Sequence, residues 1–191
     1  LAHVSFTGGQ IRNQGLVRQG GGGAVVGAGV QINGAWQLDA GRMTVQGQHR
    51  MESLVHSAML TVEGALNVGS LVFNNGAKLG TSYIPGGSVI NAEGQASFDG
   101  TSTLDVNYGH TLNLGGNATW TAGNGRLVIA SGFNAGMPGA VPTSALNMAL
   151  GTTFTDAGAA SVSGIKIIGG GGSIINDGAY RREGLGTTEA V

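Results

Sequence analysis

The chain has 191 residues, of which 38 are glycine, 10% are charged and 41% are hydrophobic, and its formal net charge is −1. This composition excludes collagen, because glycine has no three-residue period and there are only three prolines. It also argues against disorder, because low charge is combined with many Val, Leu and Ile residues. The basic residues are scattered, which argues against nucleic acid and anionic membranes as partners. No apolar run of about 18 residues occurs, so we expect no membrane insertion.

Nothing in the composition divides the chain. No linker or shift in composition separates one part from another, so we expect a single domain over residues 1–191. The chain contains no cysteine, so stacking rather than disulfide bonds would have to stabilise it. The first residue is leucine and no signal peptide precedes it, so we expect that residue 1 is not the native start.

A segment near the beginning of the chain recurs near its end. Residues 8–23 read GGQIRNQGLVRQGGGG and residues 171–186 read GGSIINDGAYRREGLG, with eight identities in sixteen positions at a constant offset of 163. We predict that matched residues of the two copies take part in stacking at a repeat boundary, namely Asn13, Gly15, Arg18, Asn176, Gly178 and Arg181. The chain is then one period of a longer array plus the beginning of the next, which favours a scaffold over an enzyme.

Residues 48–59 interrupt the general pattern, because they contain no glycine. Their apolar residues recur at i, i+3, i+4, i+7 and i+8, and they are Met51, Leu54, Val55, Ala58 and Met59. This spacing predicts a short helix that flanks the rest of the fold, with a strand as the alternative.

From Leu60 onward, apolar residues come in pairs that bracket one residue, as in Leu60 and Val62 or Leu104 and Val106. Such alternation places both side chains on one face of a strand. Between the pairs lie Gly and Asn steps such as Asn33-Gly34, which supply the positive φ that sharp corners need. The pattern is typical of an all-β chain with many short strands.

Two architectures use such strands. One is an antiparallel sandwich or barrel. The other is a parallel β-helix (β-solenoid), which the small aliphatic residues and the long-range repeat favour. Three strands per coil predict roughly 20–25 residues per coil. The stretch 133–148 contains two of the three prolines and is predicted to form a lateral loop.

No motif predicts a catalytic, cofactor or metal site. The glycine clusters at 20–23 and 169–172 lack the Lys-Ser or Lys-Thr of a phosphate loop, so we interpret them as tight corners. His49 and His56 lie seven residues apart, which is far for one metal ion, and we expect them to be solvated. Asp99 and Asp105 could project from one face as a pair of carboxylates, but nothing distinguishes them from solvated residues.

The boundary segment resembles a known group of sequences. The pattern Asn-x-Gly-x-x-Arg followed by Gly-x-Gly is similar to recurring segments in the passenger β-helices of autotransporters and in filamentous-haemagglutinin-like adhesins. The residues that carry the resemblance are Asn13, Gly15, Arg18, Gly21 and Gly23, repeated as Asn176, Gly178, Arg181, Gly184 and Gly186. The resemblance implies a β-helical stalk or fibre on the outside of a bacterium.

We therefore expect a non-catalytic structural or adhesive segment of a repetitive extracellular fibre or cell-surface adhesin. Its main partner would be itself, head-to-tail, because an uncapped terminal coil leaves unpaired strand edges. Host or cell-surface glycans are a second expected partner. The alternative is a bacteriophage tail fibre or tailspike that binds, and in some cases cleaves, surface glycans. A third class, enzymes of the pectate-lyase type, needs a carboxylate and calcium cluster that the sequence lacks.

Overall fold

The computed structural model describes residues 3–12, 14–74, 76–80, 88–99, 103–121, 123, 126–130, 143–157, 164–168 and 172–183. The described residues form an all-β structure that contains strands and no helix. Every strand pairing among them is parallel. The parallel pairing excludes the antiparallel sandwich or barrel as the fold.

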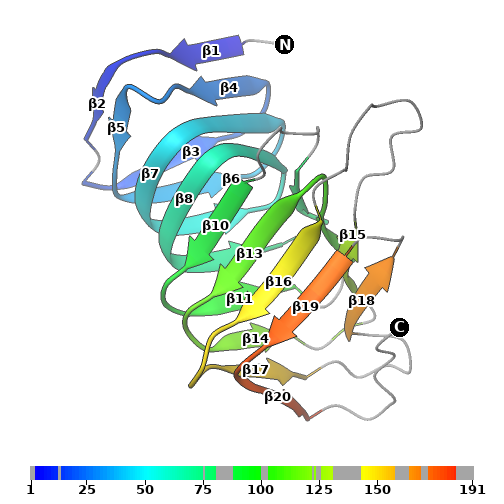
Figure 1. Ribbon diagram of the computed structural model, residues 1–191. Coiled ribbons are helices and arrows are strands. Elements are labelled where there is room, and N and C mark those ends of the chain that lie inside the picture. Colours follow the sequence, from blue (N-terminus) through cyan, green and yellow to red (C-terminus); the bar gives the residue numbers. More distant parts are fainter. Residues whose placement is uncertain are drawn as a thin grey trace.

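The sheet curls until it is nearly closed into a solenoid-like shape, with strands β1 and β20 at opposite ends of the stack (Figure 1). Its strands align in three rows, which we call faces A, B and C. Face A contains β1 (His3–Phe6), β4 (Gly23–Val26), the first parts of β7 (Arg42–His56) and β8 (Met59–Phe73), β9 (Lys78–Leu79), β12 (Thr103–Val106), β15 (Arg126–Ala130) and β18 (Gly164–Ile168). Face B contains β2 (Gly9–Ile11), β5 (Val30–Ile32), the middle parts of β7 and β8, β10 (Ser88–Ala92), β13 (His110–Leu114), β16 (Ser144–Met148) and β19 (Gly172–Asn176). Face C contains β3 (Leu16–Gln19), β6 (Ala35–Leu38), the last parts of β7 and β8, β11 (Ala96–Phe98), β14 (Ala118–Trp120), β17 (Thr153–Asp156) and β20 (Ala179–Arg182).

The chain passes through faces A, B and C in that order, so each passage is one coil. Coil 1 consists of β1 to β3 and coil 2 of β4 to β6, while β7 and β8 each form a complete coil. Coils 5 to 8 are formed by β9–β11, β12–β14, β15–β17 and β18–β20. With the exception of β5 on face B, each strand of coils 1 to 7 pairs with the strand one coil further on, which stacks the coils at the spacing of about 4.8 Å between neighbouring strands.

The spacing between stacked partners is less regular than the expected 20–25 residues. Ser88 lies opposite His110, 22 residues further on, which fits the expectation. Arg42 lies opposite Met59 after only 17 residues, and Arg126 lies opposite Gly164 after 38. The longest spacings between stacked partners span the predicted loop at 133–148. Of that stretch, residues 144–148 form strand β16, and residues 133–142 lie outside the described residues.

The helix predicted at 48–59 is wrong, because residues 48–56 belong to strand β7 and Met59 begins strand β8. On face B the buried residues His49 and Met51 alternate with exposed neighbours, and on face C the buried residues Leu54 and His56 alternate with half-buried ones. The corner between the two faces adds one residue, so Met51 and Leu54 are three apart although both point inward. Two alternating segments joined out of phase thus imitate the spacing of an amphipathic helix.

The core is a column of side chains stacked from coil to coil. On face C, the register places His56, Phe73, Phe98 and Trp120 opposite one another in successive coils. The rings of Phe73 and Phe98 are stacked with centroids 5.7 Å apart, and those of Phe98 and Trp120 are 6.2 Å apart. All of these rings are fully buried. Aliphatic residues fill the rest of the interior, so the parallel register itself produces the core.

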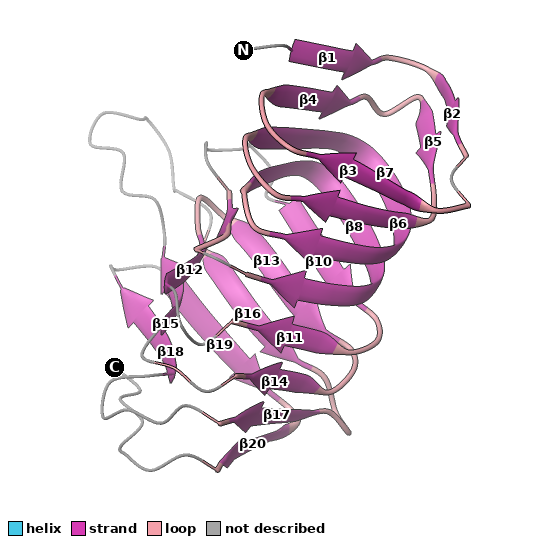
Figure 2. Ribbon diagram, turned by 180° about the vertical axis from the view of Figure 1, so that it is seen from behind, coloured by secondary structure: helices cyan, strands magenta, loops and turns pink. Residues whose placement is uncertain are grey.

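Glycine permits the corners at which the stacked coils approach one another most closely. Strands β7 and β8 bend side by side (Figure 2). Gly47 and Gly64 lie opposite one another in these strands and have φ of 87° and 135°. A Cβ on Gly64 would lie 2.2 Å from the carbonyl oxygen of Gly47. In the cluster 20–23, Gly22 has φ of 69°, which confirms a corner there, whereas residues 169–171 lie outside the described part.

Candidate functional site

The two copies of the repeated segment occupy the same place in the first and the last described coil. The segment 8–23 provides β2, β3 and the first residue of β4, and the segment 171–186 provides β19 and β20. Strands β3 and β20 both lie on face C, and the residue range of β20 is that of β3 shifted by the offset of 163. The two strands lie at opposite ends of the stack (Figures 1 and 2). One period of the sequence therefore corresponds to seven coils.

In the first copy, Arg18 forms an ion pair across to the next coil. Its side chain lies on the outer surface of β3, and its Nε donates to the carboxylate of Asp39. The amide of Gln37, the residue opposite Arg18, donates to the other oxygen of Asp39 at 2.6 Å. The hydrogen bond from Arg18, and after it the one from Gln37, holds the pKa of Asp39 below its ordinary value. Arg18 therefore connects coil 1 to coil 2.

In the second copy, Arg181 has a different partner. It lies on β20 opposite Thr155 of coil 7, and its guanidinium pairs with Glu183 of the same coil at 3.1 Å. Both side chains are largely exposed, at 70% and 44%. On the side where Arg18 has Asp39, no described strand lies beyond β20. Arg181 thus carries the same charge at the same position as Arg18, in the last described coil of the stack.

Of the other matched residues, Gly15, Asn176 and Gly178 lie at the corners between faces B and C. The Oδ1 atom of Asn176 accepts a hydrogen bond from the backbone N–H of Gly178 at 3.1 Å. A Cβ on Gly178 would lie 2.6 Å from the carbonyl oxygen of Thr152, so the corner requires glycine. Gly15 precedes β3 as Gly178 precedes β20, and Asn13 lies outside the described residues. The stacking role of these residues stays a prediction.

The interior of coil 8 is polar as well as aromatic. Tyr180 stacks on Phe154 with ring centroids 5.7 Å apart. Asp156 is fully buried, and its Oδ2 accepts hydrogen bonds from the hydroxyl of Tyr180 at 2.5 Å and from Nη1 of Arg182 at 2.9 Å. The buried carboxylate is therefore compensated by a cation and a hydroxyl from the last coil, which fixes β20 on β17.

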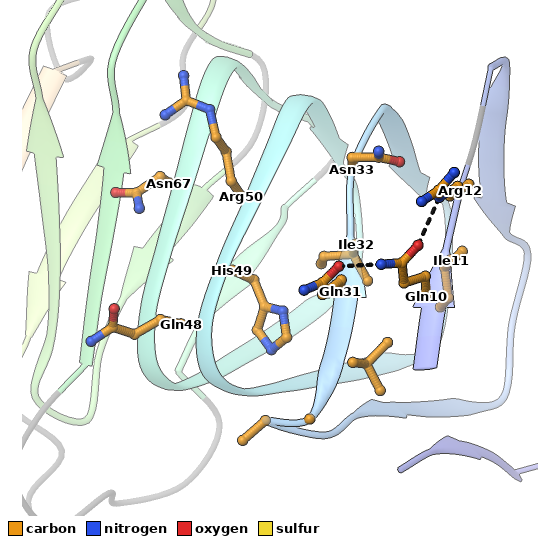
Figure 3. A pocket seen from close by; sticks show the side chains of 13 residues that line it. Gln10, Ile11, Arg12, Gln31, Ile32, Asn33, Gln48, His49, Arg50 and Asn67 are labelled. Atoms are coloured by element: carbon orange, nitrogen blue, oxygen red, sulfur yellow. Dashed lines mark hydrogen bonds between the residues drawn. The ribbon is translucent and has the colours of Figure 1, made fainter. Parts of the chain in front are cut away.

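Near the other end, the structure contains an open cleft that the sequence did not predict (Figure 3). It has a volume of about 890 Å³ and lies on face B, between β5 and β7. Among the described strands, β5 pairs only with β2, so the ladder of face B is interrupted at this point. The cleft is lined mainly by amide and guanidinium side chains, including Gln10, Gln31, Gln48, Arg12 and Arg50.

Hydrogen bonds hold several of these side chains in place. The amide of Gln10 donates to Oε1 of Gln31 at 2.6 Å, and Nε of Arg12 donates to Oε1 of Gln10 at 2.7 Å (Figure 3). Arg50 forms a two-pronged ion pair with Glu93, at 2.7 and 2.6 Å. Comparison of the repeated segments could not have found the cleft, since Gln10 and Arg12 are not among their identical positions.

Three of the four histidines are buried and His3 is exposed, so the expectation that His49 and His56 are solvated is wrong. His56 and His110 are fully buried and His49 is 5% exposed. Nε2 of His49 bonds to the carbonyl oxygen of Gln46 at 2.7 Å. The described residues contain no group of three His, Cys, Asp or Glu side chains that could hold a metal ion. The three histidines are part of the packed interior.

The two aspartates considered for glycoside hydrolysis do not share a face. Asp99 follows β11 on face C, whereas Asp105 lies in β12 on face A. Asp105 lies 3.5 Å from the ammonium group of Lys78 in the preceding coil. The structure therefore does not present them as a pair of carboxylates facing one another across a groove.

The chain was compared with protein-family models, with curated proteins and with solved structures. No match was found in any of the three comparisons. In the part of the chain that the structure describes, no helix is long and apolar enough to cross a membrane.

Proposed function

We propose that this chain is a non-catalytic structural or adhesive segment of a repetitive extracellular bacterial fibre or surface adhesin, which stacks head-to-tail. The observation that carries the proposal is the position of the repeated segment. Its two copies lie on the same faces of the first and the last described coil, seven coils apart. Because the segment recurs after a whole number of coils, a further repeat could stack on this one with the same arrangement of strands.

The fold class that supports this function is a parallel β-helix. All described pairings are parallel, inward side chains stack in columns, and corners such as those at Gly47 and Gly64 bring backbone against backbone. In such a fold each coil rests only on its neighbours, so length can be added without a new core. A stalk or fibre needs this property, whereas a compact enzyme does not.

The resemblance to autotransporter passengers and filamentous-haemagglutinin-like adhesins supports an extracellular or cell-surface location. The location can be tested with antibodies raised against the purified chain. We expect them to label intact, unpermeabilised cells of the source bacterium, and a protease added to intact cells should remove the label. Labelling only after permeabilisation would contradict the proposed location.

A bacteriophage tail fibre or tailspike remains the second candidate, and the cleft on face B favours it. Amide and guanidinium groups such as those of Gln31, Gln48 and Arg50 are suited to bind sugar hydroxyl groups. A panel of bacterial surface polysaccharides tests this candidate. Binding that is lost in a Gln31→Ala, Gln48→Ala variant, but kept in a Ser97→Ala control on face C, would favour glycan recognition.

The same panel tests the proposal that the chain is not an enzyme. We expect no cleavage of any polysaccharide. Cleavage that disappears in an Asp99→Ala, Asp105→Ala variant would contradict a purely structural role.

A further inference from the structure

The structure assigns a specific partner and register to the last coil. We propose that coil 8 of one copy docks on coil 2 of a second copy, in the position that coil 1 occupies within its own chain. The proposal rests on the head-to-tail function proposed above and deepens it. It applies to two separate chains and to two successive repeats of one longer chain.

The first argument is the equivalence of the two end coils. Strand β3 of coil 1 pairs with β6 of coil 2, so that Leu16 lies opposite Ala35 and Arg18 opposite Gln37. Strand β20 of coil 8 aligns with β3 position by position at the offset of 163, with Ala179 at the place of Leu16, and arginine is the identical residue, as Arg18 and Arg181. The surface of coil 2 that receives β3 is therefore shaped to receive β20.

The second argument is charge, which separates two possible registers. If coil 8 stacked directly on coil 1 of another copy, Arg181 would lie opposite Arg18, and like charges directly opposite one another on adjacent strands are destabilising. If coil 8 instead stacks on coil 2, Arg181 lies opposite Gln37 and within reach of Asp39. Within one chain, Arg18 already makes these contacts.

The third argument is the fit of the interior. In coil 2, the ring of Trp36 is 4% exposed and lies opposite Val17 of coil 1. In the proposed register Trp36 lies opposite Tyr180 instead, which would extend the stack formed by Phe98, Phe154 and Tyr180.

The fourth argument is that the first strand of coil 1 is exposed to solvent. All four residues of β1 are exposed, including the apolar side chains of Val4 at 47% and Phe6 at 37%. Coil 8, by contrast, is fixed to coil 7 by the buried Asp156 and its bonds to Tyr180 and Arg182. Exchange of coil 1 for the coil 8 of another copy therefore places the larger ring of Tyr180, in place of Val17, opposite Trp36.

Disulfide cross-linking of the full chain tests the register, because the chain contains no cysteine of its own. Facing residues on neighbouring strands lie about 4.8 Å apart, within the range that a disulfide can bridge.

The variant Ala35→Cys, Ala179→Cys reports docking of coil 8 on coil 2. The variant Leu16→Cys, Ala179→Cys reports docking on coil 1, and both variants keep Arg18, Asp39 and Arg181. A Leu16→Cys, Ala35→Cys control should close within one chain, since these residues already face one another.

We expect a ladder of cross-linked dimers and larger species in the first variant and little in the second. Adding Arg181→Glu to the first variant should reduce the cross-linked fraction about two- to five-fold, as for an exposed ion pair. Cross-linking mainly in the second variant, or equally in both, would overturn the register but leave head-to-tail stacking intact. No cross-linking between chains in either variant, together with a monomer in sedimentation, would overturn the register and the proposed function together.

Discussion

At the scale of single residues, the two fully buried histidines make stability depend on pH. Burial lowers the pKa of His56 and of His110 from 6.5 to about 4. His110 is held neutral by its contacts, because its Nδ1 donates to the carbonyl oxygen of Asn107 while its Nε2 accepts from the backbone N–H of Val62. His56 lies edge-on to Phe73 and donates to the carbonyl oxygen of Lys78.

We predict that the free energy of unfolding falls as the pH drops from 6.5 to 4. In this window the unfolded chain binds protons at both histidines and the folded chain does not, so acid favours unfolding. The full loss is on the order of 3 kcal/mol per histidine. Denaturant unfolding at several pH values measures this loss. In the variant His56→Phe, the free energy of unfolding should depend less on pH, because the contribution of His56 is removed. A wild-type stability that stays constant across this window would contradict the burial of the two rings.

Gly64 should tolerate no side chain. A Cβ there meets the carbonyl oxygen of Gly47 in the neighbouring coil, and the φ of 135° is unfavourable for any L-residue. We predict that Gly64→Ala lowers the free energy of unfolding by about 3 kcal/mol or more, since the backbone of one coil must shift away from that of the other. Thermal unfolding measures the effect. Gly20→Ala is the matched control, because nothing lies within 4 Å of a Cβ at that position, and it should change stability little.

At the scale of elements, a ladder of asparagines connects four coils on the outer surface of face B. Asn91 donates to Asn67, Asn113 to Asn91 and Asn147 to Asn113, each at 2.7 Å. The register places these residues directly opposite one another in successive coils. Such stacked amides fix the register, because a shift by one residue would break every rung.

We predict that Asn113→Ala destabilises the chain by about 1–3 kcal/mol. The change removes two half-buried hydrogen bonds, so that Nδ2 of Asn147 loses its acceptor and Oδ1 of Asn91 loses its donor in the middle of the ladder. Thr111→Ala, on the same strand and half-buried as well, is the control and should cost less. Equal effects of both changes would show that the ladder adds no stability of its own.

The sequence predicts most of the strands because their alternation is intact within each face. It fails at 48–59, where the phase changes at a corner between Met51 and Leu54, and local spacing alone cannot distinguish such a corner from a helix. It also places His56 on the surface, although the register puts this ring on Phe73 in the next coil. Both errors arise from contacts between residues about one coil apart, which a short window does not contain.

The same limit applies to the candidate site. The repeat predicts Arg18 and Arg181 as equivalent residues, but not that Asp39 is the partner of one and Glu183 of the other. The cleft on face B depends on β5 not pairing with β7, a property of backbone spacing that leaves no mark in the sequence.

At the scale of the whole molecule, the central claim is that coils continue from one copy to the next. Strands β1 to β3 and β18 to β20 each pair with one neighbouring coil, and no described strand lies beyond them. Open strand edges of this kind recruit further chains. Because both ends run in the same direction, the proposed contact would be head-to-tail and would not close after two copies.

Sedimentation of the purified chain over a wide range of concentrations tests this claim most directly. We predict an average mass that keeps rising with concentration and does not level off at the dimer, because each added copy presents the same open end as the last. A chain that remains monomeric throughout, or that stops at a closed dimer, would contradict the account.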